Sequence, residues 1–159
     1  MKTIYSIGDD QKTLYATRTF NAPVSAVWEA WTNRDLLERW WAPRPYKAVT
    51  KSFDFSEGGA WHYHMLGPEG AVHWCLNAYE KIEPEVQFTA VDAFCDEDMH
   101  INESMPVSHW LVEFSEADGS TTVKVTSTYR SEAELQTVRD MGMEAGFDMG
   151  LNQLEEVLA

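Results

Sequence analysis

The chain has 159 residues, of which 44% are hydrophobic and 13% aromatic, and this composition excludes a disordered chain. Twelve basic against 26 acidic residues give a formal net charge of -14, which excludes nucleic-acid backbones and anionic membrane surfaces as partners. No stretch approaches the roughly 18 consecutive apolar residues of a membrane span, and the start lacks the apolar core of a signal peptide. We therefore expect a cytoplasmic protein that binds no nucleic acid and inserts into no membrane.

The length suits one domain with a core of its own. Residues 1–11 are expected to form a flexible lead-in, followed by a single domain over residues 12–159. From residue 12 to residue 20, apolar residues alternate with threonine and tyrosine, which predicts a strand.

Two short helices are predicted after this strand. In the first, Pro23 suits the first turn, and the apolar residues that follow it recur at helical spacing. Asn33 can cap the second, over residues 34–41, which ends at Trp40 and Trp41 before two prolines. Adjacent helical residues point about 100° apart, so the two tryptophans can hardly serve one core face. We expect one of them to plug the end of the core and the other to pack against the loop that follows.

Six further strands are predicted in the middle of the chain. Short turns rich in glycine, proline and acidic residues separate most of them, which favours an antiparallel meander. The predicted strands cover residues 47–55, 60–66, 71–81, 86–94, 107–115 and 121–129.

The chain is predicted to end in one long helix. Ser131 and Glu134 have the spacing of a capping box, and an apolar stripe follows at steps of three and four residues. A helix of roughly 25 residues would span about 38 Å, enough to cross a whole sheet. Three glycines along one side predict close approach by another backbone or room for a guest, and a kinked helix is the alternative. They are Gly142, Gly146 and Gly150.

Several short motifs follow one another in an order that resembles the START-like (SRPBCC, helix-grip) superfamily, and within it homologues of the C-terminal domain of the heat-shock-protein ATPase activator. The resemblance covers roughly residues 12–158. It implies an α+β helix-grip fold, in which a curved antiparallel sheet of six or seven strands wraps around a long C-terminal helix, with an apolar cavity between them. The motifs are AP at 22–23 with VW at 27–28, LLERWWAP at 36–43, GG at 58–59, YEKIEP at 79–84 and MGMEAG at 141–146.

Histidines raise the question of a metal or acid–base site. His62 and His64 share one face of a strand, and a four-residue turn at 67–70 would set His73 opposite His64. A slip of one residue would move His73 to the other face. Neither an HExxH nor a CxxC motif accompanies them. We therefore expect surface histidines, no metal and no cofactor, with a metal or catalytic cluster as the alternative.

The cysteines and Asp92 are likewise expected to have no catalytic role. Cys75 and Cys95 are expected to lie too far apart for a disulfide. Asp92 is expected to face solvent on the convex side of the sheet, and the alternative is a cavity acid with a raised pKa. We name no catalytic residue, and a binding protein is favoured over an enzyme.

Large aromatic side chains on the predicted strands and last helix point to a small-molecule site. Binding pockets are mostly apolar with a few polar groups, and methionine adapts to varied guests. A filled core without a cavity is the alternative. The predicted ligand-binding residues are Trp61, Tyr63, Trp74, Phe88, Trp110, Met143 and Phe147.

The function expected from these features is binding of a small hydrophobic molecule, lipid-like or aromatic, by a carrier or sensor. One alternative is a cyclase-like or hydrolase-like enzyme that uses a cavity His, Asp or Tyr as its acid–base group. The other, which the resemblance implies, is a stress-response partner protein that contacts a chaperone. A monomer or weak dimer is expected.

Overall fold

The computed structural model describes residues 2–159 and contains one curved antiparallel sheet of eight strands in the order β1-β2-β8-β7-β6-β5-β4-β3. The strands are β1 (Ile4–Ile7), β2 (Thr13–Phe20), β3 (Lys47–Phe53), β4 (Ala60–Leu66), β5 (Val72–Glu83), β6 (Gln87–Phe94), β7 (Val107–Ala117) and β8 (Ser120–Tyr129). The helices are α1 (Val24–Thr32), α2 (Arg34–Trp40), α3 (Glu132–Asp140) and α4 (Met143–Leu158).

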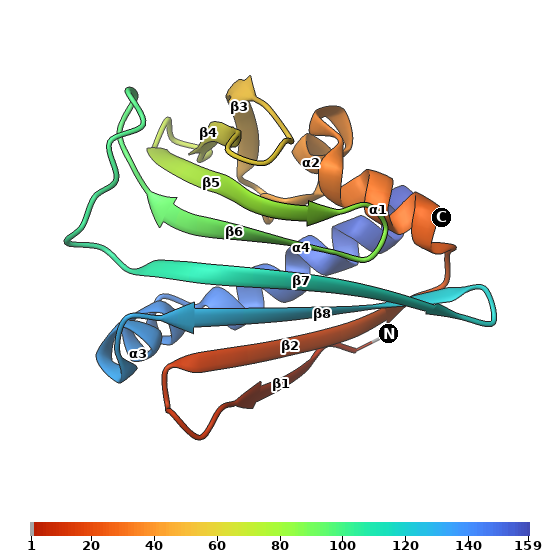
Figure 1. Ribbon diagram of the computed structural model, residues 1–159. Helices are drawn as coiled ribbons and strands as arrows, with labels where there is room; N and C mark the ends of the chain where they lie inside the picture. The colour runs from red at the N-terminus through yellow and green to blue at the C-terminus, as the bar shows by residue number, and fades with distance from the viewer. Residues whose placement is uncertain (1) are drawn as a thin grey trace.

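The concave face of the sheet, called the inner face below, wraps around α4 (Figure 1). Leu151 and Leu154 of α4 are buried in the main core together with side chains from the sheet, α1 and α2. In the ribbon, α1 and α2 lie toward the C-terminal end of α4, and α3 lies at its other end. The α+β helix-grip fold expected from the sequence is thus confirmed. None of the helices in residues 2–159 combines the length and apolarity needed to cross a membrane.

Strand β1 lies in the segment that was expected to be a flexible lead-in, and it brings the number of strands to eight. It pairs with β2 in a register that sets Tyr5 opposite Ala16, on the inner face. The Tyr5 hydroxyl donates to the Asp148 carboxylate at 2.8 Å, so a side chain of α4 holds this edge strand in place. A four-residue strand has too short a pattern to be distinguished from a lead-in by alternation alone.

The C-terminal helix is interrupted once, so the kinked alternative is observed at the first of the three glycines. α3 ends at Asp140, and Gly142 has a φ of 84°, a left-handed conformation that glycine adopts without steric cost. Ser131 caps α3 as predicted, since its Oγ accepts from the Glu134 N–H at 3.2 Å. Close backbone approach is found farther along, because a Cβ at Gly150 would lie 3.3 Å from the Trp40 carbonyl oxygen.

A buried glutamine of α4 joins that helix to the end of α2. The Gln153 amide nitrogen donates to the carbonyl oxygens of Trp40 and Ala42, both at 2.9 Å, and its oxygen accepts from the Arg44 N–H at 3.0 Å. Trp40 is fully buried beside it and donates from Nε1 to the Ala30 carbonyl at 2.8 Å. Trp40 is therefore the tryptophan that plugs the end of the core.

Candidate functional site

Aromatic side chains from three strands and one helix meet on the inner face. The rings of Trp61 and Tyr63 are stacked with centroids 4.0 Å apart, and both residues are buried. Trp110 of β7 meets Phe147 of α4 with ring centroids 5.8 Å apart. Phe88 of β6 is buried in the same cluster. The fold thus brings these five predicted site residues together between the sheet and the helices.

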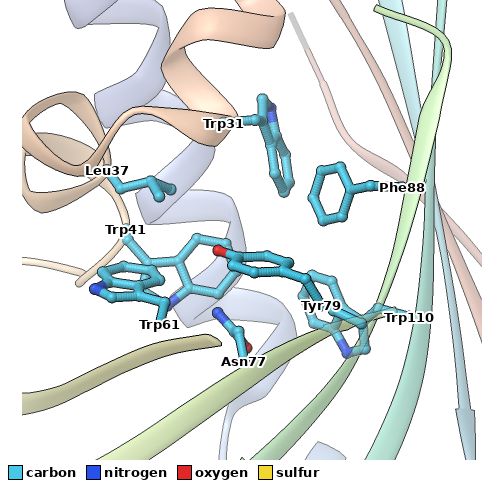
Figure 2. Close-up of a pocket in the computed structure, with 9 residues that line it drawn as sticks. Trp31, Leu37, Trp41, Trp61, Asn77, Tyr79, Phe88 and Trp110 are labelled. Carbon is cyan, nitrogen blue, oxygen red and sulfur yellow. The ribbon is translucent and has the colours of Figure 1, made fainter. Parts of the chain in front are cut away.

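Part of this cluster encloses a void, called the inner cavity below (Figure 2). Its volume is about 20 Å³, which is room for roughly one water molecule. Pockets for drug-sized ligands are typically about 300–1,000 Å³, so the void in this structure is too small for such a ligand. The lining residues are Trp31, Leu37, Trp41, Trp61, Asn77, Tyr79, Phe88, Ala90 and Trp110.

Two of the predicted site residues lie away from the inner cavity. Trp74 is on the outer face, where its ring lies 4.7 Å from that of His64. The reason is the turn between β4 and β5, which spans residues 67–71 rather than 67–70 and sets Trp74, not His73, opposite His64. Met143, at the start of α4, packs against a separate small core beneath α3.

Trp41 lines the cavity but was not among the predicted ligand-binding residues, although it makes a hydrogen bond and several ring contacts there. Its Nε1 donates to the Tyr63 hydroxyl at 2.7 Å, and its ring lies 5.8 Å from Trp61 and 5.9 Å from Trp110. Trp41 therefore lines the inner cavity. The expectation that it packs against the loop after α2 was wrong. The signal was present in the sequence, because a residue about 100° from a buried helical neighbour must face another surface.

Asp92 also lies on the inner face, which corrects the expectation that it faces solvent on the convex side. The register sets it between Asn77 of β5 and Ser108 of β7. Burial raises its pKa from the ordinary value of 3.8 to about 7. The negative charge of Asp92 adds to burial in raising the pKa of the Cys75 thiol to about 12, so that thiol is a poor nucleophile.

The histidines form no cluster, because the five-residue turn moves His73 to the opposite face from His64. His62 is buried instead of exposed, and its Nε2 lies 2.9 Å from the Asp96 carbonyl oxygen. The chain after β6 thus folds back over the outer face. Cys75 and Cys95 are both free thiols, as predicted.

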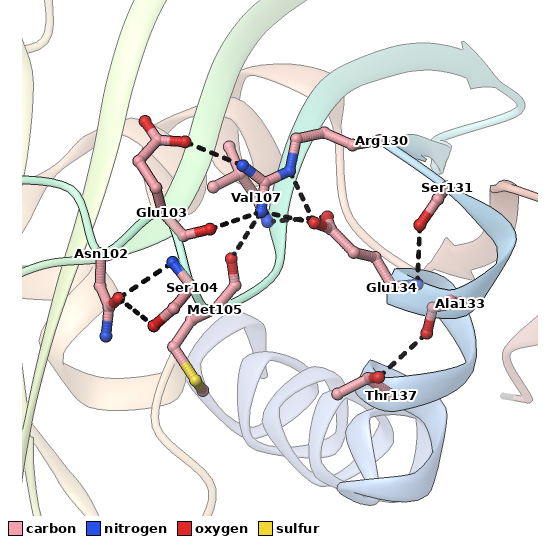
Figure 3. A network of polar contacts seen from close by, with 10 residues as sticks. All are labelled: Asn102, Glu103, Ser104, Met105, Val107, Arg130, Ser131, Ala133, Glu134 and Thr137. Atoms are coloured by element: carbon pink, nitrogen blue, oxygen red, sulfur yellow. Dashed lines mark hydrogen bonds and ion pairs between the residues drawn. The ribbon is translucent and has the colours of Figure 1, made fainter.

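An arginine network joins the loop before β7 to the first turn of α3 (Figure 3). Arg130 donates to the Glu103 carboxylate at 2.8 Å and to the Met105 carbonyl oxygen at 2.9 Å. It also donates from Nε to Glu134 at 2.6 Å, and Glu134 in turn accepts from the Val107 N–H. These bonds hold the first turn of α3 beside the start of β7 and the loop before it.

The family model described as "Activator of Hsp90 ATPase homolog 1-like protein" matches residues 21–159, most of the chain. The chain belongs to this family. The match includes both short helices, the helix-grip sheet from β3 to β8 and α4, so every lining residue of the inner cavity lies within the family region.

Solved structures show the same fold at full length. Protein Ms6760 from Mycobacterium smegmatis is 31% identical with a TM-score of 0.90, over 99% of this chain and 98% of that one. A protein from Staphylococcus epidermidis is 32% identical with a TM-score of 0.85, over 96% and 93%. A protein from Arthrobacter aurescens is 28% identical with a TM-score of 0.90, over 98% and 90%. No curated protein matches significantly.

Proposed function

We propose that this family member binds a small, largely apolar molecule between the sheet and α4, as a carrier or sensor in the cytoplasm. The observation that carries the proposal is the inner cavity, a void in an otherwise aromatic wall with the amide of Asn77 in its lining. Apolar walls with a few polar groups are typical of small-molecule sites. Trp41, Trp110 and Phe147 remain only half-buried, so they are available to a guest.

Binding requires the walls to move, because the void as it stands admits about one water molecule. The break at Gly142 separates α3 from α4, and Leu135 is the one fully buried residue of α3. α3 is therefore held by a small apolar core around Leu135 and by the Arg130 network. Displacing α3, with Met143 and Phe147 beside it, enlarges the inner cavity from the side of Asp92.

A second candidate function is acid–base catalysis on the bound molecule. It is favoured by Asp92, whose pKa of about 7 suits a general base at neutral pH. The chaperone-partner role is favoured by the family description alone. We rank both below binding, since residues 2–159 place no second acid–base group in hydrogen-bond contact with Asp92.

The test enlarges a side chain of β6 that lines the inner cavity and measures ligand affinity. The control makes the same substitution on the opposite face of β6. Ala90 and Ala93 of β6 are both buried, but Ala90 lines the cavity and Ala93 faces outward. Fatty acids, sterols and planar aromatic compounds are titrated calorimetrically into each variant. For the best binder we expect Ala90→Leu to weaken affinity by about tenfold or more, because three extra carbons occupy the ligand's space.

Ala93→Leu is the matched control. We expect it to change affinity by less than about twofold, because the added carbons lie on the outer face of β6, away from the ligand. Circular dichroism verifies that both variants fold. Equal affinities for the two variants, or no binding by the wild type to any compound in the panel, would show that the inner cavity is not a ligand site.

A further inference from the structure

Asp92 lies on the inner face beside residues that line the inner cavity, and its carboxylate has no counter-charge. Its cross-strand partner Asn77 lines the cavity, and so does Ala90, the next residue on the same face of β6. Across the described residues 2–159, no hydrogen bond or ion pair reaches this carboxylate. Asp92 is half-buried and therefore remains partly accessible. A carboxylate in this position is a strong, unoccupied hydrogen-bond acceptor for a bound molecule.

No basic side chain is placed to neutralise it. Arg18 is the only arginine or lysine buried in the described part of the chain, and it lies on β2, three strands from β6. It is already held by Glu155 at 2.8 Å and by Asn152 at 2.7 Å. The net charge of -14 adds a long-range field that attracts cations and repels anions. The electrostatic character of the cavity end is therefore negative.

Aromatic rings surround the same position. Phe94 follows Asp92 on the same face of β6, and Trp110 is its diagonal neighbour on β7, a spacing of about 7–8 Å between strands. Tyr63 and Tyr129 are near enough for the Asp92 charge to raise the pKa of both hydroxyls. Aromatic faces attract cations, and together with one carboxylate they form the kind of site that recognises ammonium groups.

We propose that the Asp92 end of the inner cavity recognises a hydrophobic organic cation, a protonated amine carried on an apolar ring or chain. The amine would donate to the Asp92 carboxylate while its apolar body lies against Trp110 and Trp41. This inference rests on the proposed function and names the chemical class of its ligand.

The experiment compares three probes of one shape by calorimetry at pH 8: 2-naphthylmethylamine, 2-naphthylmethanol and 2-naphthoate. We expect the amine to bind about tenfold tighter than the alcohol, and the carboxylate to bind most weakly. Asp92→Asn should bring the amine down to the affinity of the alcohol and leave the alcohol unchanged. Asp9→Asn removes the same charge from an exposed turn and should leave all three affinities unchanged.

A second readout is pH. Between pH 8 and pH 6 the amine probe stays protonated, whereas Asp92, with a pKa of about 7, gains a proton, so amine binding should weaken several-fold. The titratable groups that face Asp92 are Tyr63 from β4, Cys75 from β5 and Tyr129 from β8, and all three stay neutral because burial raises each pKa. Glu134 at the first turn of α3 stays ionised, since Arg130 lowers its pKa.

The outcomes separate the two proposals. If the alcohol binds and the amine binds no better, or if Asp92→Asn leaves amine affinity unchanged, the cation site is refuted and the apolar cavity stands. If none of the three probes binds, the cavity proposal fails for aromatic ligands and the cation site fails with it.

Discussion

Replacing Gln153 with leucine is expected to lower the free energy of unfolding by about 4 kcal/mol, because it removes the hydrogen-bond partner of two buried carbonyl oxygens and of one part-buried N–H at once. The carbonyl oxygens of Trp40 and Ala42 would lose their donor, and the Arg44 N–H would lose its acceptor. Each buried polar group left unsatisfied costs about 1–3 kcal/mol, and water reaching the exposed Arg44 side offsets part of the sum. Leucine adds apolar burial but cannot supply any of these bonds.

Urea denaturation of the wild type and of two variants measures this effect. Gln136→Leu is the matched control, because Gln136 lies on the exposed side of α3 and its amide bonds only to Asp140. Its expected change is within about 0.5 kcal/mol. A loss below about 1 kcal/mol for Gln153→Leu would mean that the end of α2 is held by packing of Trp40 and not by the glutamine.

Asp92→Asn is expected to stabilise the protein at pH 8 and to have little effect at pH 4. The folded state raises the Asp92 pKa from 3.8 to about 7, so between these values the native protein holds a proton that the unfolded chain has lost. Stability therefore falls as pH rises through this window, and the penalty is complete above about pH 7. The full difference corresponds to about 4 kcal/mol, and partial solvation of the half-buried carboxylate reduces this to roughly 2–3 kcal/mol.

Urea denaturation at pH 4, 6 and 8 tests the sign as well as the size. The stability gained by Asp92→Asn over the wild type should be near zero at pH 4 and should increase with each step in pH. Asp9→Asn shows the effect of removing one exposed negative charge. A gain that is constant across pH, or a destabilisation at pH 8, would place the Asp92 carboxylate in water rather than on the inner face. A residue that lowers stability in this way is typical of a functional site.

Much of the fold could be predicted because its signals are local. Asn33 and Ser131 cap helices where the sequence places them, since capping depends on one side chain and a neighbouring N–H. The strand pattern from β3 to β8 follows from alternation and turn residues within a few positions. The break at Gly142 was weighed only as an alternative, because a glycine at this spacing also suits a continuous helix in close contact with another backbone.

The candidate site was predicted less well because it depends on register. One additional residue in the turn between β4 and β5 moves Trp74 and His73 to opposite faces from those expected. Asp92 was assigned to the convex face because charged residues usually face solvent. Its face is instead set by the strand register, which pairs it with Asn77 and Ser108. The sequence indicates that Trp41 faces another surface than Trp40, but which surface depends on how Gln153 of α4 holds the end of α2, a contact between distant parts of the chain.

The most direct test of ligand binding in the inner cavity uses the indole N–H signals of the seven tryptophans in an NMR titration. The best binder from the compound panel is added to the 15N-labelled protein. We predict saturable shifts for Trp41, Trp61 and Trp110, which line the inner cavity, and none for Trp74 on the outer face. Shifts confined to Trp74, or no shift for any lining tryptophan at saturating ligand, would contradict the proposal and leave the inner aromatics as a filled core.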